Sequence, residues 1–138
     1  MPAIYEHLHT VAPEEIDAHG HANNLRYLHW MQSAAVAHSA AQGWSHDDYQ
    51  RLGLGWVVRT HTIKYLQSAL AGDEILVRTW VGDLTRFAST RKYRIHRRRD
   101  DVLLAAAETQ WVLVDLTTRA LASIPDELRN SFIIVDRT

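Results

Sequence analysis

The sequence contains no cysteine, only three prolines and no long apolar run. Without cysteine it has no disulfide, thiolate metal ligand or cysteine nucleophile, which suits a reducing compartment. The longest unbroken apolar stretch, residues 102–107, is far shorter than the roughly 20 residues that cross a bilayer. The first residues include Glu6 and lack the apolar segment of a secretory signal. We therefore expect a soluble, cytoplasmic protein with no membrane partner.

Net charge is also nearly absent, at -1, but the charges are unevenly distributed. Residues 1–50 hold one basic side chain against six acids, whereas Arg86 to Arg99 holds seven basic residues and no acid. Such a basic stretch attracts phosphates, which nucleic acid, coenzyme A or an acidic carrier protein would provide. The alternative is a solvated strand whose neighbours supply acids. Because the pI is about 6.7 and the N-terminal third is acidic, we expect no nucleic-acid partner.

The 138 residues, 46% of them hydrophobic, are sufficient for one domain with a proper core. No repeat, low-complexity segment or Pro/Gly/Ser linker divides them. We therefore expect a single domain over residues 1–138.

One long helix is predicted over residues 23–42, because Asn23 or Asn24 suits an N-cap and Gly43 a C-terminal stop. Ser45 is a possible cap for a shorter helix, and Pro125 marks the start of a last helical turn. Strands are predicted by apolar alternation elsewhere. They cover residues 5–11, 56–66, 74–84, 87–97 and 102–116, with a possible short strand at 120–124.

This order predicts an α+β fold, with the helix against an antiparallel sheet of five or six strands. A single helix covers one sheet face only. We place apolar residues on the other face, which then needs a partner: Val77, Trp80, Tyr93, Trp111 or Leu113. A homo-oligomer, most simply a two-fold dimer, follows.

The most informative stretch is residues 15–28, which are polar and run into the N-terminus of the long helix. Unpaired N–H groups at a helix N-terminus can stabilise a developing oxyanion. A carboxylate just before them, such as Asp17, can act as nucleophile or general base. Caps and turns also use Asp, Asn and Gly, so a purely structural role is the alternative.

Residues Asp17 to Tyr27, D-A-H-G-H-A-N-N-L-R-Y, resemble the D-x-x-G-H-V-N-N-x-x-Y motif of hotdog-fold acyl thioesterases. These are the 4-hydroxybenzoyl-CoA thioesterase-like family and the related acyl-carrier-protein thioesterases. The resemblance covers about residues 5–130. Further segments similar in order and spacing are Ile63–Tyr65, Gly72–Ile75, Val77–Thr79, Ala105–Thr109, Trp111–Asp115 and Ile124–Pro125.

The resemblance implies a hotdog fold, with a sheet wrapped around the long helix and sites between the subunits of a homodimer or homotetramer. It implies hydrolysis of acyl-CoA or acyl-carrier-protein thioesters to a free acid and a thiol, with no cofactor and no metal. Asp17 matches the nucleophile or general base, and the backbone N–H of Asn24 matches the group that polarises the carbonyl. His21 joins them in the catalytic group, while Asn23 and Tyr27 match substrate-binding positions.

The resemblance also gives the basic stretch a role, since coenzyme A phosphates lie on basic side chains in this family. Candidate contacts to the nucleotide or phosphopantetheine are Arg86, Ser89, Thr90, Arg91 and Lys92.

Two departures from the family pattern leave alternatives open. Gln32 and Ser33 stand where the family often has a helical Glu, so a second carboxylate beside Asp17 is in doubt. His19 is an unusual residue in the motif, and with Asp17 and His21 it makes a two-His, one-carboxylate metal site conceivable. Non-catalytic acyl-thioester binding and a hotdog hydratase or dehydratase are the alternative functions.

Overall fold

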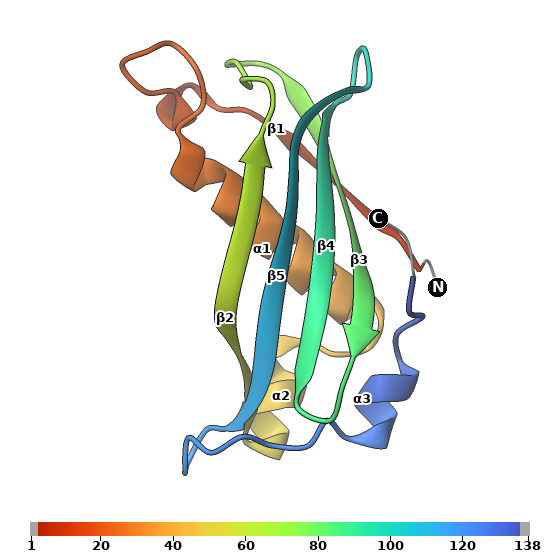
Figure 1. The fold of residues 1–138 in the computed structure, drawn as a ribbon. Coiled ribbons are helices and arrows are strands. Elements are labelled where there is room, and N and C mark those ends of the chain that lie inside the picture. The colour runs from red at the N-terminus through yellow and green to blue at the C-terminus, as the bar shows by residue number, and fades with distance from the viewer. Residues whose placement is uncertain (1–2, 136–138) are drawn as a thin grey trace.

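The computed structural model describes residues 3–135 (Figure 1). Its helices are η1 (Pro13–Glu15, a 3-10 turn), α1 (Asn24–Ala41), α2 (His46–Leu52) and α3 (Asp126–Asn130). Its strands are β1 (Tyr5–Thr10), β2 (Leu54–Tyr65), β3 (Glu74–Leu84), β4 (Ala88–Arg97) and β5 (Val102–Asp115). These elements confirm the predicted α+β class and differ from the predicted bounds by at most two residues at the strand ends.

The five strands form one antiparallel sheet in the order β1-β3-β4-β5-β2. β3, β4 and β5 follow one another as hairpins, which their short turns require. The chain therefore places β1 and β2 at the two sheet edges (Figure 1). A further strand at residues 120–124 is not formed, because Leu121 makes only an isolated bridge to Val114.

α1 begins and ends where its capping residues predict. The Asn23 side chain accepts a hydrogen bond from the Leu25 N–H, and Gly43 follows the helix at φ +95°. The helix lies along one face of the sheet, where it contacts mainly β3 and β1. Ala34 and Ala35 are buried there, and their small side chains let the helix approach the strands closely. No helix of residues 3–135 is long and apolar enough to cross a membrane.

The placement of four apolar residues on the uncovered sheet face is wrong. Val77 and Tyr93 are fully buried in the core with α1, Leu113 packs against Trp44, and Trp111 faces a cavity beside the helix. Strand register explains this, because cross-strand partners share a face: the directly paired Thr79, Tyr93 and Ala107 all point toward α1.

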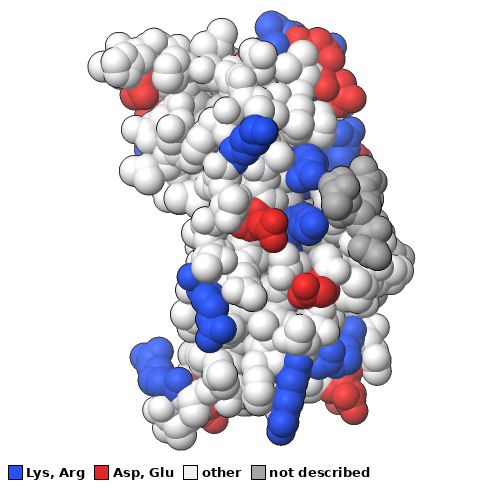
Figure 2. All heavy atoms as spheres, in the orientation of Figure 1, with Lys and Arg blue, Asp and Glu red and all other residues white. Residues whose placement is uncertain are grey.

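The outer face of the sheet is consequently more polar than the sequence predicts. Of the five residues, only Trp80 lies on it, buried beneath the Arg94 guanidinium at 5.6 Å. Its strand partner Lys92, and Glu108, which pairs with Lys92 in turn, both carry charges. Figure 2 shows Lys, Arg, Asp and Glu side chains spread over this side of the molecule. This outer face is polar and therefore does not by itself require a partner subunit to cover it.

Candidate active site

The loop before α1 folds back on itself, so that its two ends meet. Ile16 and Ala22 pair as an isolated antiparallel bridge. Gly20 turns the chain at φ +84°, in the left-handed region that glycine adopts without strain. The Ala22 N–H also donates to the Ala69 carbonyl at 2.8 Å, which ties the loop to the segment after β2. Residues 17–21 therefore project as a short, fixed turn at the N-terminal end of α1.

Asp17 stands at the start of this turn, half-buried. Its backbone N–H donates to the His21 carbonyl at 3.0 Å. One carboxylate oxygen, Oδ1, accepts the His19 N–H at 2.8 Å. The other oxygen has no hydrogen-bond partner among residues 3–135. The Asp17 carboxylate is thus held by one oxygen and available through the other.

In the first turn of α1, the backbone N–H of Asn24 has no acceptor among residues 3–135. The Asn23 Oδ1 atom accepts from the Leu25 N–H at 2.9 Å, and the Asn23 carbonyl accepts from the Arg26 N–H at 2.9 Å. A free N–H at the positive end of a helix can polarise a carbonyl oxygen.

A buried carboxylate that the sequence analysis missed holds this loop in place. Glu15 Oε1 accepts hydrogen bonds from His9 Nε2 at 2.7 Å and from the Ala12 N–H at 2.9 Å, and Oε2 accepts from Trp30 Nε1 at 2.8 Å. Its backbone carbonyl accepts the Asn23 N–H at 3.0 Å. Burial acts to raise the pKa of Glu15, but these hydrogen bonds outweigh burial and hold the pKa below its usual value. No local pattern signals this contact, because its partners come from β1 and α1.

Asn23 and Tyr27, the predicted substrate-binding residues of the motif, both make contacts within the chain. The Asn23 side chain caps α1. Tyr27 is 2% exposed, and its hydroxyl accepts from the Ala69 N–H at 3.2 Å and donates to the Gln67 carbonyl at 3.4 Å. The structure therefore places Tyr27 in the core, where it anchors the segment that also holds Ala22.

His21 lies on the loop beside His19, with the two rings stacked at 6.0 Å between centroids. No group of three His, Asp or Glu side chains in residues 3–135 is arranged to hold a metal ion. The conceivable metal set of Asp17, His19 and His21 is therefore not assembled. His21 is half-buried at the turn, next to the Asp17 backbone.

The structure does not bring the five predicted phosphate contacts together. Strand alternation sends Ser89 and Arg91 toward α1, where both are buried, and sends Thr90 and Lys92 to the opposite face. Arg86 is exposed at the turn between β3 and β4.

Neighbouring acids pair with two other arginines of the basic stretch, at the end of β4 and just after it. Arg97 binds Asp100 at 3.0 Å, and Arg98 binds Glu74 at 3.2 Å. Neighbouring strands and turns thus supply counter-charges to part of the basic stretch. This agrees with the alternative hypothesis of a solvated strand whose neighbours supply acids.

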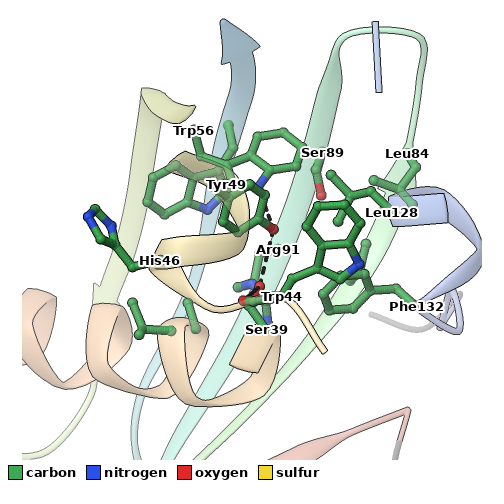
Figure 3. Close-up of a pocket in the computed structure, with 14 residues that line it drawn as sticks. Ser39, Trp44, His46, Tyr49, Trp56, Leu84, Ser89, Arg91, Leu128 and Phe132 are labelled. Carbon is green, nitrogen blue, oxygen red and sulfur yellow. Dashed lines mark hydrogen bonds between the residues drawn. The ribbon is translucent and has the colours of Figure 1, made fainter. Parts of the chain in front are cut away.

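A cavity of about 270 Å³ lies between the second half of α1, α2 and the sheet (Figure 3). Its walls are largely aromatic: Trp44, Tyr49, Trp56, Trp111 and Phe132. Hydrogen bonds link three elements around it, because Tyr49 OH bonds Ser39 Oγ at 3.1 Å and accepts from Trp56 Nε1 at 3.1 Å. Pre-formed, mainly apolar cavities with a few fixed polar groups are the usual form of a small-molecule site.

The cavity and the Asp17 loop lie at different ends of α1. The cavity reaches α1 no nearer its start than Ala35, eleven residues after Asn24, which corresponds to roughly 16 Å of helix. Within one chain, the two candidate parts of a site are therefore separated.

Comparison with known proteins decides the family. A model of the thioesterase-like superfamily matches residues 11–132, which include the Asp17 loop, α1 and the whole of β2 to β5. The chain belongs to the thioesterase-like superfamily. This confirms the resemblance seen in the Asp17–Tyr27 motif.

Solved structures share the fold of this superfamily member. A 1,4-dihydroxy-2-naphthoyl-CoA thioesterase from Synechocystis superimposes with a TM-score of 0.88 at 19% identity, covering 98% of this chain and 99% of that one. The 12:0-ACP thioesterase from Umbellularia californica gives a TM-score of 0.83 at 22% identity, over 95% of this chain and 51% of the other. These similarities confirm the hotdog fold.

A sequence relative is the chloroplastic palmitoyl-acyl carrier protein thioesterase of Cuphea hookeriana. It is 27% identical over 133 residues, which are 92% of this chain and 32% of the relative. The chain thus spans about a third of the length of this curated relative.

Proposed function

We propose that the protein hydrolyses acyl thioesters of coenzyme A or acyl carrier protein. The observation that carries the proposal is the unused Asn24 N–H at the start of α1, with the Asp17 carboxylate on the loop that leads to it. A thioester carbonyl needs one oxyanion donor and one carboxylate, because the thiolate is already a good leaving group. The names of the relatives, thioesterases for acyl-CoA or acyl-ACP, support this substrate class.

Two routes are compatible with this arrangement. In the first, an Asp17 oxygen attacks the carbonyl carbon, the carbon–sulfur bond breaks, the thiol leaves and water hydrolyses the mixed anhydride. In the second, Asp17 takes a proton from water, whose oxygen attacks the carbonyl carbon directly; the carbon–sulfur bond then breaks and the thiolate takes up the proton. In both routes the Asn24 N–H stabilises the negative charge on the carbonyl oxygen, and His21 lies close enough in the loop to shape the site. The products are a carboxylic acid and a thiol.

We further propose that the acyl group occupies the aromatic cavity of one protomer while the partner's Asp17 performs the chemistry. β2 is an edge strand that connects the two regions. Trp56, near its start, lines the cavity, and Tyr65, at its end, donates from its hydroxyl to the Asn24 carbonyl at 3.3 Å. When two such strands pair antiparallel about a two-fold axis, the start of one lies beside the end of the other. The cavity of each protomer then lies beside the Asp17 loop of its partner.

Exposed apolar side chains support a homodimer on this side of the molecule. Leu25 and Val36 on α1 are each 65% exposed, and Val57, Tyr65 and Leu66 on or next to β2 are also exposed. Apolar side chains grouped in this way are typical of an interface. A tetramer built from two such dimers is compatible with the same contact.

Thiol release from a panel of short, long and aromatic acyl-CoA and acyl-ACP thioesters tests the proposal. We expect Asp17→Asn to lower kcat/KM by about a hundredfold or more, because it removes the base or nucleophile. The matched control is Asp47→Asn, which changes an exposed Asp in the first turn of α2 and should retain full activity. Equal activity of wild type and Asp17→Asn, with both folded, would contradict the assignment of Asp17.

A further inference from the structure

Arg91 lies in the wall of the aromatic cavity, deep in the molecule. It reaches in from β4, and only 6% of its surface is exposed (Figure 3). Among residues 3–135 it is the only Lys or Arg that lines the cavity. A guanidinium in proteins stays charged, so the cavity contains a fixed positive charge.

The hydrogen-bond partners of Arg91 do not neutralise this charge. Its Nη1 atom donates to His38 Nδ1 at 2.9 Å and to Thr79 Oγ1 at 3.1 Å. Because a guanidinium only donates, His38 Nδ1 must be an unprotonated acceptor, and the imidazole in this contact is neutral. The threonine hydroxyl is neutral as well.

No acid in the described part of the chain pairs with Arg91. None of the ion pairs among residues 3–135 includes it, whereas Arg78 of β3, Arg97 of β4 and Arg98 just after β4 each contact a carboxylate. The Phe132 ring lies 5.9 Å from the guanidinium, which adds a weaker cation–π attraction. No hydrogen bond from Nε or Nη2 is found within residues 3–135. Buried charges in proteins are paired, so the cavity is electrostatically complete only when an anion enters.

We propose that this cavity selects acyl groups that carry a carboxylate at the end remote from the thioester, with Arg91 as the counter-ion. The inference rests on the proposed thioesterase function and names its substrate class. The aromatic walls pack against the apolar body of the acyl group, and the unused guanidinium donors match the two carboxylate oxygens. A methyl-terminated acyl group of the same length would displace solvent from Arg91 and leave the charge unpaired.

Matched pairs of thioesters test the selection. One pair is para-carboxybenzoyl-CoA and para-methylbenzoyl-CoA, and the other is suberyl-CoA and octanoyl-CoA. We expect the wild type to show a kcat/KM at least about tenfold higher for the carboxylate-terminated member of the pair that fits the cavity. Arg91→Met, which keeps the side-chain length and removes the charge, should reverse this preference. Arg91→Lys, which keeps the charge, should retain part of it.

The outcomes separate this inference from the proposed function. Hydrolysis that favours the methyl-terminated members in the wild type, or a preference unchanged by Arg91→Met, overturns the carboxylate selection and leaves the thioesterase proposal standing. Loss of all hydrolysis in Asp17→Asn with the preference intact in the wild type supports both.

A binding measurement covers the case in which no thioester of the panel is hydrolysed. Calorimetry compares para-methylbenzoate with its neutral amide, para-methylbenzamide. Binding of the carboxylate to the wild type, lost in Arg91→Met, supports an anion site in the cavity whatever the reaction. Equal binding of carboxylate and amide, or binding that survives Arg91→Met, overturns it. Circular dichroism of each variant establishes that it is folded.

Discussion

Among single residues, Glu15 has the contacts that matter most for the shape of the candidate catalytic loop. Its carboxylate joins His9 of β1 to Trp30 of α1, and its backbone carbonyl holds Asn23. Asp17 follows two residues later and depends on this anchor for its position. We therefore regard Glu15 as a positioning residue for Asp17.

Replacing Glu15 with Gln should weaken both the loop and the fold. The amide nitrogen of Gln cannot accept the hydrogen bonds that the carboxylate accepts, which leaves a buried donor without its partner. We expect the free energy of unfolding in urea to fall by about 1–3 kcal/mol. Glu14→Gln, at the exposed neighbouring position, is the control and should leave stability nearly unchanged.

The same pair of variants gives a pH test. The pKa of Glu15 is held below its ordinary value of 4.5, so its ionised form contributes stability that is fully present above that pH. This contribution is lost as the pH falls through the lowered pKa. The wild type and Glu14→Gln should therefore lose more stability on acidification below pH 4.5 than Glu15→Gln does. Parallel stability curves for all three proteins would contradict the role of Glu15.

Among the elements, α1 is proposed to contribute to the chemistry through a backbone group at its N-terminus. If the backbone N–H of Asn24 polarises the thioester carbonyl, the exposed side chain of Asn24 is not needed for activity. Asn24→Ala should keep activity. Asn24→Pro should lower kcat by about a hundredfold or more, because proline has no N–H.

Proline at this position is a clean test, because it fits the first residue of a helix. Asn23, the residue before it, is already extended, at φ -62° and ψ 137°, as a residue before proline requires. Circular dichroism should show an unchanged helix content in Asn24→Pro. Full activity of a folded Asn24→Pro would exclude the Asn24 N–H as the oxyanion donor.

On the scale of the whole molecule, a site shared between two protomers predicts complementation. Asp17→Asn has an intact cavity, and Ser89→Phe has an intact loop but places a ring in the cavity, which Ser89 lines. Each homodimer should be inactive. Mixed under conditions that exchange subunits, they form a heterodimer in which one intact cavity faces one intact Asp17. Thiol release should then return.

If a mixture shown to contain heterodimers does not regain thiol release, the shared site is contradicted and the whole site lies within one chain. Two further variants connect recovery to the proposed interface. Val57→Asp on β2 should prevent dimerisation and abolish recovery, since it introduces a charge into the contact. Leu121→Asp changes a comparably exposed apolar residue in the loop after β5, and should leave dimerisation and recovery of activity unaffected. Sedimentation analysis measures the dimer in each case.

Much of the fold was predictable because its signals are local. The α1 helix follows from an asparagine cap and a glycine stop, and β3 follows from alternation over Glu74–Leu84. The motif Asp17–Tyr27 lies within one short stretch, so its place before α1 could also be predicted. The prediction of a short strand at residues 120–124 was wrong, because Leu121 makes only a single bridge to Val114.

The sequence by itself therefore determined the order of elements, the family and the residues of the candidate catalytic loop. Only the tertiary structure decided that Arg91 is buried in an aromatic cavity, that Glu15 anchors the loop and that Tyr93 faces the helix. The physical reason is that these contacts join segments far apart in the chain. The order β1-β3-β4-β5-β2 and its register decide which face each side chain occupies, and a shift of one residue would reverse the faces.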